Sequence, residues 1–89
     1  MGAADYAGAA AHFREALARD GTTNATLLNN LAVALEALGR YDEALATYKQ
    51  ALQTGSKPTP LRRNYARFAE FYTSYAKGVK PKETNDAPH

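Results

Sequence analysis

The side chains that could carry out chemistry in this sequence are few and scattered. The chain has no cysteine and two histidines, His12 and His89. His12 falls within a helical pattern beside Phe13, where a surface or packing role is expected, and His89 is the last residue. Catalytic and metal sites need several titratable or ligating groups at matched spacings. We therefore expect no enzyme active site, no metal ion and no cofactor.

The sequence also lacks the usual signals for phosphate and nucleic-acid recognition. Its small-residue stretch near the start, AADYAGAA, fits neither of the glycine-rich nucleotide-binding patterns. The basic residues of the last third do not form one long stripe, which is the usual footprint of nucleic-acid binding. We expect no nucleic acid among the partners.

The groups with real binding potential are amides and guanidinium groups. Asn30 and Asn64 stand 34 residues apart, and each amide offers donors and an acceptor that can pair with a peptide backbone of any sequence. Arg63 and Arg67 flank Asn64, and an arginine fork suits bidentate contact with a carboxylate or phosphate. The alternative is that all four side chains are ordinary solvent-facing groups.

Charge is unevenly distributed along the chain. Residues 1–56 carry four basic and six acidic side chains, a net charge of −2, and residues 57–89 carry seven basic and three acidic ones, a net charge of +4. A basic C-terminal third favours acidic partners. A solvated helix surface followed by a polar tail is the other interpretation.

Length and composition limit the architecture. Eighty-nine residues allow one small domain with a modest core. The 45% apolar and 22% charged content is typical of a soluble globular chain. We expect no membrane span, because no apolar run approaches about 18 residues, and no signal peptide, because its basic and apolar segments are missing. The composition does not indicate a compartment, and the cytoplasm is the default.

Hydrophobic periodicity predicts four helices and no strand. The expected ranges are about Ala4 to Arg19, Ala25 to Leu38, Tyr41 to Gln53 and Thr59 to Lys77. Thr59 as cap, with Pro60 at the first helical position, gives the last helix a strong start signal. Short connections make consecutive helices antiparallel neighbours, with Gly39 in a hairpin turn. The tail, residues 79–89, is too polar and proline-rich to become ordered by itself.

Two pairs of the expected helices align at a nearly constant offset. Setting Tyr6 on Tyr41 aligns the first and third helices with an offset of 35, and the second and fourth align at 34. The matched pairs include Phe13 with Tyr48, Ala16 with Ala51, and Asn30 with Asn64. A fixed period near 34 in two-helix units indicates a stacked helical array.

On these residues the chain resembles the tetratricopeptide repeat family. The family pattern places large residues and a small one on the first helix, and an alanine followed by an aromatic on the second. The matching residues here are Leu28, Leu31, Ala32, Leu35, Ala44 and Tyr48, with Gly39 and Tyr41 at the turn. The closing proline of the pattern falls on Ser56, two residues before Pro58. The resemblance implies an all-α fold of antiparallel helical hairpins stacked as a short superhelix.

The resemblance also divides residues 1–78 into unequal parts. Residues 25–58 match one complete repeat, and residues 4–21 match only the second helix of a preceding one. Residues 59–78 match a first helix less well, and they are interpreted as a first-helix-like or capping helix. Residues 79–89 form the expected disordered tail.

In this family the first helix of each repeat lines a concave groove that takes peptides or partner helices. At 100 degrees per residue, the core stripe of the second helix is leucine-rich: Leu27, Leu28, Leu31, Leu35 and Leu38. The candidate groove residues are Thr26, Asn29, Asn30, Val33, Arg63, Asn64, Arg67 and Phe71. The chain is therefore expected to be a protein-interaction module, with the two arginines favouring acidic partners.

The alternative is structural self-association, or docking into a larger repeat array without a peptide ligand. The first helix lacks its usual partner, so Phe13 and Leu17 are expected to be partly uncovered and available to a second copy. The aromatics of the fourth helix, Tyr65 to Tyr75, are expected to pack against the third helix, with Phe71 directed towards the groove.

Overall fold

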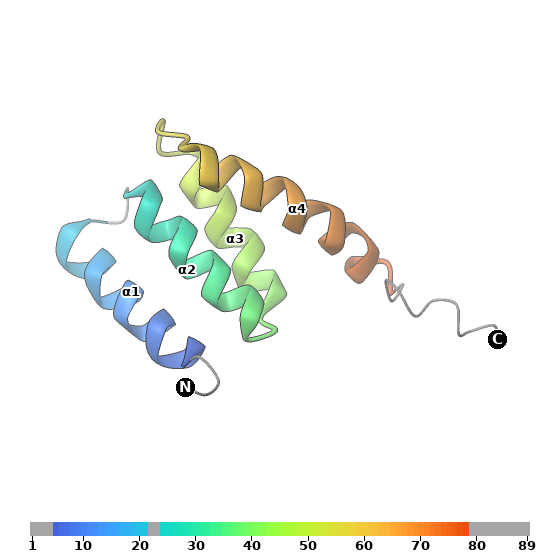
Figure 1. Ribbon diagram of the computed structural model, residues 1–89, viewed down its shortest axis with the longest axis horizontal. Helices are drawn as coiled ribbons and strands as arrows, with labels where there is room; N and C mark the ends of the chain where they lie inside the picture. The colour runs from blue at the N-terminus through green and yellow to red at the C-terminus, as the bar shows by residue number, and fades with distance from the viewer. Residues whose placement is uncertain (1–4, 22–23, 79–89) are drawn as a thin grey trace.

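The computed structural model describes residues 5–21 and 24–78, and this part of the chain is built from helices alone. The helices are α1 (Tyr6–Asp20), α2 (Ala25–Ala37), α3 (Tyr41–Leu52) and α4 (Thr59–Ala76) (Figure 1). The expected all-α fold is confirmed, and the helix limits agree with the sequence to within two residues. The expected disordered tail, 79–89, lies outside the described residues.

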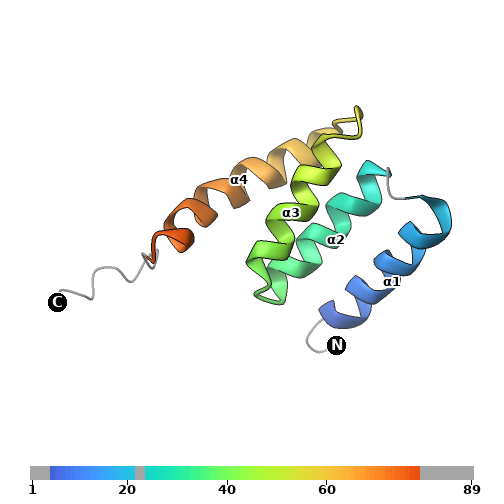
Figure 2. The same ribbon diagram turned by 180° about the vertical axis from the view of Figure 1, so that it is seen from behind.

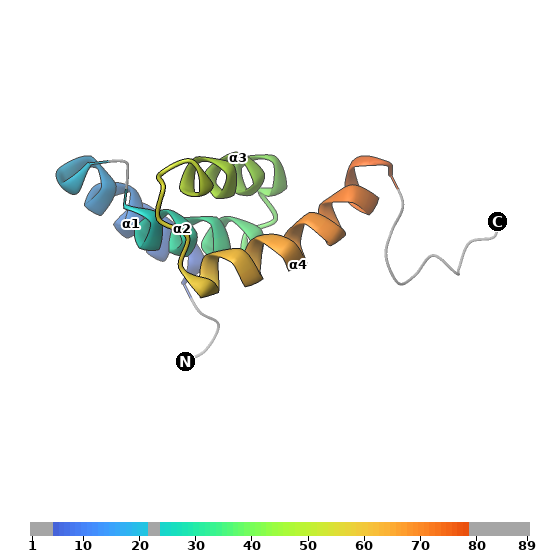
Figure 3. The same cartoon turned by 90° about the horizontal axis from the view of Figure 1, so that it is seen from above.

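Consecutive helices run antiparallel, as the short connections predict. α2 lies between α1 and α3 in both face-on views (Figures 1 and 2). Seen from above, α3 occupies one layer while α2 and α4 lie in the layer beneath it (Figure 3). α4 contacts both α2 and α3, so the α2–α3 hairpin and α4 form a three-helix unit that carries α1 on its free α2 side.

The helix ends follow from local hydrogen bonding. The Asp5 carboxylate accepts from the Gly8 amide at 2.8 Å, and the Asn24 side chain accepts from the Leu27 amide at 3.0 Å. These bonds satisfy backbone donors that the first turn of a helix leaves unpaired. Asp5 and Asn24 are therefore the N-caps of α1 and α2.

The α2–α3 turn depends on the backbone of Gly39. Its φ of 80° is left-handed, which glycine adopts without steric cost. The Gly39 amide then donates to the Glu36 carbonyl, and the Arg40 amide to the Leu35 carbonyl, each at 2.9 Å. This is the hydrogen-bond pattern of a Schellman turn, and it lets α3 begin at Tyr41 without a longer loop.

α4 begins one residue earlier than its start signal predicts. Thr59 is already helical and its side chain makes no capping bond, so the prediction that Thr59 caps the helix is wrong. Pro58 is the flanking residue, in extended conformation, and Pro60 follows Thr59 inside the first turn. The rings of Pro58 and Pro60 fix their φ angles and lack N–H donors, so the first turn forms without a side-chain cap.

The α2–α3 contact is made of leucines facing small residues. Ala32, Ala44 and Ala51 are fully buried, which lets the two helix backbones approach closely. Leu28, Leu31 and Leu35 are buried as predicted, and Leu27 is partly buried. Leu38 is 37% exposed, so its place in the predicted core stripe is wrong. It lies in the turn, because α2 ends at Ala37.

The aromatic side chains of α4 cover α3 around one fully buried ring. The Phe68 ring centroid lies 5.4 Å from that of Tyr48 and 6.4 Å from that of Tyr41. Tyr75 also lies against Tyr41, at 4.8 Å, but remains 43% exposed. Aromatic pairs at these separations stabilise by about 0.5–1.5 kcal/mol beyond their buried area. The predicted packing of α4 on α3 is therefore present.

α1 packs on α2 through a small apolar strip. Ala10, Ala16 and Leu17 are buried, whereas Phe13 is only partly buried. The expectation that Leu17 is partly uncovered is wrong, because its side chain joins the main core cluster. The expectation for Phe13 agrees with its partial exposure.

Close packing at the α2–α3 contact can be tested by enlarging a buried alanine. We expect Ala44→Leu to lower the free energy of unfolding by about 1–3 kcal/mol, because the added carbons must displace neighbours in a filled core. Ala46→Leu is the matched control, since Ala46 is exposed on the same helix. Urea unfolding followed by circular dichroism measures both, and equal effects would contradict the packing described above.

Candidate partner-binding groove

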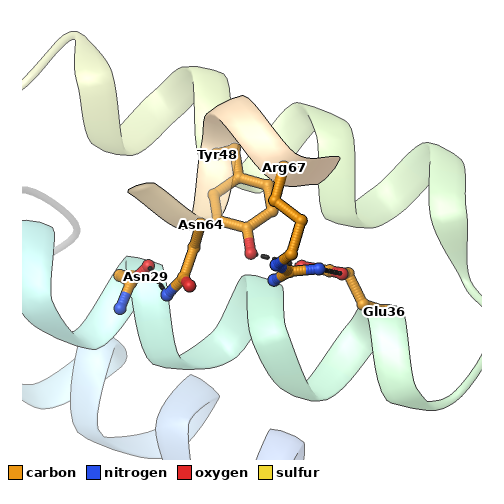
Figure 4. A network of polar contacts seen from close by, with 5 residues as sticks. All are labelled: Asn29, Glu36, Tyr48, Asn64 and Arg67. Carbon is orange, nitrogen blue, oxygen red and sulfur yellow. Dashed lines mark hydrogen bonds and ion pairs between the residues drawn. The ribbon is translucent and has the colours of Figure 1, made fainter. Parts of the chain in front are cut away.

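A carboxylate on α2 joins α3 and α4. The Glu36 side chain accepts a hydrogen bond from the Tyr48 hydroxyl of α3 (Figure 4). It also accepts two from the Arg67 guanidinium of α4, at 3.1 and 3.3 Å. The Glu36 side chain is 15% exposed and that of Arg67 is 57% exposed, so the pair lies at the edge of the core. A bidentate arginine–carboxylate contact of this kind fixes orientation as well as supplying attraction.

The same contacts alter two pKa values. Burial raises the pKa of the Tyr48 hydroxyl well above its ordinary value, and the hydrogen bond to the Glu36 carboxylate raises it further. The bond to Glu36 also raises the pKa of Arg67, against the opposing effect of burial. Tyr48 therefore stays protonated as a donor, and Arg67 stays charged.

The Glu36 pairing changes the electrostatics expected for this face. Arg67 is a candidate for holding a ligand carboxylate, but both of its terminal nitrogens already donate to Glu36. Arg63 is exposed and forms no ion pair within the described residues. The preference for acidic partners thus stays a prediction. Of the two candidate arginines of α4, Arg63 is the one left to support it.

Two of the three candidate asparagines bind each other. The Asn64 amide nitrogen donates to the Asn29 side-chain oxygen at 3.2 Å, linking α4 to α2 (Figure 4). Asn29 is buried with 7% exposure, although helical geometry alone places it on the groove side. Asn30 is half-buried, and within residues 5–21 and 24–78 its amide has no hydrogen-bond partner. Asn30 is therefore the amide that is available to a ligand.

A hollow of about 340 Å³ lies beside Asn30 and is lined by residues of α1, α2 and α4. Its lining residues are Tyr6, Ala9 and Phe13 of α1, Asn29, Asn30, Val33 and Ala34 of α2, and Asn64 of α4. None of these side chains carries a charge. Apolar walls with a few amides are typical of sites that hold an uncharged or backbone-like group.

A second, smaller hollow of about 250 Å³ lies between α2, the start of α3 and α4. It is lined by Glu36, Tyr41, Arg67 and Phe71. The Phe71 ring stands edge-on to that of Tyr41, with centroids 4.8 Å apart. This hollow is more polar than the first, and its charged groups are already paired with each other.

The structure places six of the eight predicted groove residues around these two hollows. The first is lined by Asn29, Asn30, Val33 and Asn64, and the second by Arg67 and Phe71. Thr26 and Arg63 are exposed and line neither hollow. Sequence reasoning misses Glu36 as the central polar link, and it misses Tyr6 and Phe13 as walls. The repeat alignment could have suggested the two walls, because they match Tyr41 and Tyr48.

Two other kinds of site are not found in the described residues. No group of three or more histidine, cysteine, aspartate or glutamate side chains in residues 5–21 and 24–78 could hold a metal ion. None of the helices in that part of the chain is long and apolar enough to cross a membrane.

Comparison with known proteins gives one match. A family model described as tetratricopeptide repeat matches residues 1–58. No curated protein and no solved structure matches the chain. The matched range covers α1 and the α2–α3 hairpin and ends just before α4.

The protonated Tyr48 hydroxyl makes stability depend on pH in the alkaline range. The folded chain holds this proton more tightly than the unfolded chain, whose tyrosines ionise near pH 10. Tyr48's contribution is therefore complete below about pH 10 and is lost as the pH rises further. We expect the free energy of unfolding to fall more steeply above pH 10 in the native chain than in Tyr48→Phe. Urea unfolding at a series of pH values measures both slopes, and identical slopes would contradict the raised pKa.

Proposed function

The chain belongs to the tetratricopeptide repeat family, whose repeats generally mediate protein–protein interaction, and we propose that it holds a segment of a partner protein in the groove between α1, α2 and α4. The family is typically a non-catalytic interaction module, and we propose no reaction for this chain. The partner segment is an extended peptide or a helix, and its backbone is held by side-chain amides.

One observation carries this proposal. The Asn30 amide, with no partner in the described part of the chain, stands at the edge of an uncharged hollow of about 340 Å³. An amide can donate to a backbone carbonyl and accept from a backbone N–H at once. Partly removed from water, each such bond is worth more than it would be in full solvent. The apolar walls beside it supply burial for a side chain of the bound segment.

The other candidate residues are assigned secondary roles. Asn64 links α4 to α2 through its hydrogen bond to Asn29, and it also lines the hollow. Val33 contributes an apolar wall, and Phe71 with Arg67 extends the surface towards the second hollow. Thr26 and Arg63 are outer positions that a longer bound segment reaches.

Self-association remains the second candidate function, and one observation favours it. Tyr6 of α1 is 44% exposed, and beside it Ala9 and Phe13 are only partly buried, so apolar surface is available to a second copy. Sedimentation velocity over a range of concentrations distinguishes the two. A sedimentation coefficient that corresponds to a monomer at every concentration would exclude self-association as the main role.

The role of Asn30 can be tested by removing its amide. We expect Asn30→Ala to weaken partner binding by about 1–3 kcal/mol, because a buried backbone group of the ligand then loses its partner. Peptides selected from a random display library on the immobilised domain serve as ligands, and calorimetry measures their affinity. Gln53→Ala is the control, since Gln53 is exposed at the end of α3, away from the groove.

The location of binding is checked separately by amide-shift NMR with the same peptides. We expect the largest shifts in α2, in the first turns of α4 and in the facing side of α1. Shifts confined to the outer surface of α3 would contradict the groove as the binding site.

A further inference from the structure

The helix pairs α1–α2 and α3–α4, named here the first and the second unit, align with each other in sequence. They differ in the size of one side chain at the contact between their two helices. In the repeat alignment, Tyr6 corresponds to Tyr41 and Phe13 to Tyr48, each with an offset of 35. Between α2 and α4 the offset is 34, which sets Ala34 against Phe68. The aromatic pair is thus present in both units, but the third ring is present only in the second.

In the second unit, the Phe68 ring fills the space that its neighbours enclose. Its centroid lies 5.4 Å from that of Tyr48 and 6.4 Å from that of Tyr41, and the side chain is fully buried. These are ordinary separations for aromatic rings in a protein core. The second unit therefore shows which kind of group this architecture accepts at that place.

In the first unit, the corresponding three residues line a hollow. Tyr6, Phe13 and Ala34 all line the hollow of about 340 Å³, and Tyr6 is 44% exposed. A methyl group replaces the ring of Phe68, so the aromatic walls have no third ring between them. Exposed aromatic surface around a preformed hollow is costly in water and favours an apolar occupant.

We propose that an aromatic side chain of the partner segment enters this hollow, in the place that Phe68 occupies in the second unit. This inference rests on the proposed function and specifies the partner's chemistry: an uncharged segment with one aromatic anchor residue. The anchor packs on Tyr6 and Phe13 over Ala34, while Asn30 at the rim binds the adjacent backbone. The lining is complementary in charge to such a segment, because it contains no ionisable group apart from the Tyr6 hydroxyl.

A charged anchor fits this lining poorly. A carboxylate or ammonium group entering the hollow would lose hydration without gaining an opposite charge. The nearest cation of the neighbouring hollow, Arg67, already donates to both oxygens of Glu36. The geometry therefore favours a phenylalanine, tyrosine or tryptophan anchor over an acidic one.

The test begins with selection of random short peptides on the immobilised intact chain. We expect enriched peptides to share one aromatic position and to show no preference for acidic residues beside it. Replacing that aromatic by alanine should weaken binding about tenfold to a hundredfold, as expected for losing one buried ring. Failure to enrich any peptide would contradict the proposed function itself. Enriched peptides that need no aromatic residue would overturn only the anchor.

Variants of the chain locate the anchor. Ala34→Phe places a ring of the chain itself in the hollow, as Phe68 provides one in the second unit. This variant should abolish binding of the aromatic peptide. Because added bulk at a buried position can disturb folding, Tyr6→Ala provides a second test at an exposed position, with an expected loss of about fivefold or more. Tyr75→Ala is its matched control, with the same residue type at 43% exposure, and should leave binding unchanged.

Two results would overturn the assignment. Equal losses in Tyr6→Ala and Tyr75→Ala would show that the hollow does not hold the anchor. A dimer of the free chain in sedimentation velocity that Ala34→Phe dissolves would assign the hollow to a second copy of the chain instead of a partner segment.

Discussion

The arrangement of α2, α3 and α4 depends on the single carboxylate of Glu36. The Glu36 carboxylate accepts hydrogen bonds from Tyr48 of α3 and from Arg67 of α4 (Figure 4). One side chain at the edge of the core thus joins α2 to both other helices. Removing either partner would leave a partly buried charge less well compensated. Around this link, the buried alanines Ala32, Ala44 and Ala51 let α2 and α3 approach closely, and the Phe68 ring of α4 packs against Tyr48 of α3. Packing thus supplies most of the stability, while Glu36 selects how the helices meet.

That link also reduces the positive charge beside the first hollow, because it pairs the Arg67 guanidinium with a carboxylate. Arg67 is paired with Glu36, although its side chain is 57% exposed, and the hollow next to it is lined by amides, aromatic rings and small apolar groups. Because two amides of this face bind each other across α2 and α4, Asn30 is left as the available one. The described helices therefore enclose an uncharged hollow, although the C-terminal third of the chain is basic.

The sequence predicts what depends on local periodicity and fails where helices must be placed relative to each other. The helix limits, the Gly39 turn and the burial of Leu28 and Leu35 follow from spacing along one helix. The pairing of Glu36 with Arg67 does not, because it depends on how α4 crosses α2, 31 residues away. The prediction that Leu38 is buried fails for a related reason. It assumes helical geometry at 100 degrees per residue, but α2 ends at Ala37. The hollow beside Asn30 needs three helices in place before it exists.

The central claim is that Arg67, beside the groove, does not attract acidic ligands because its guanidinium is paired with Glu36. The most direct measurement compares two peptides with the same aromatic residue, one flanked by glutamate and the other by glutamine, at low ionic strength. We expect affinities within about twofold of each other for the native chain, since exposed unpaired charges contribute little here. In Glu36→Gln, which frees the guanidinium, we expect a severalfold preference for the glutamate peptide. A strong preference for the glutamate peptide in the native chain, unchanged in Glu36→Gln, would contradict it.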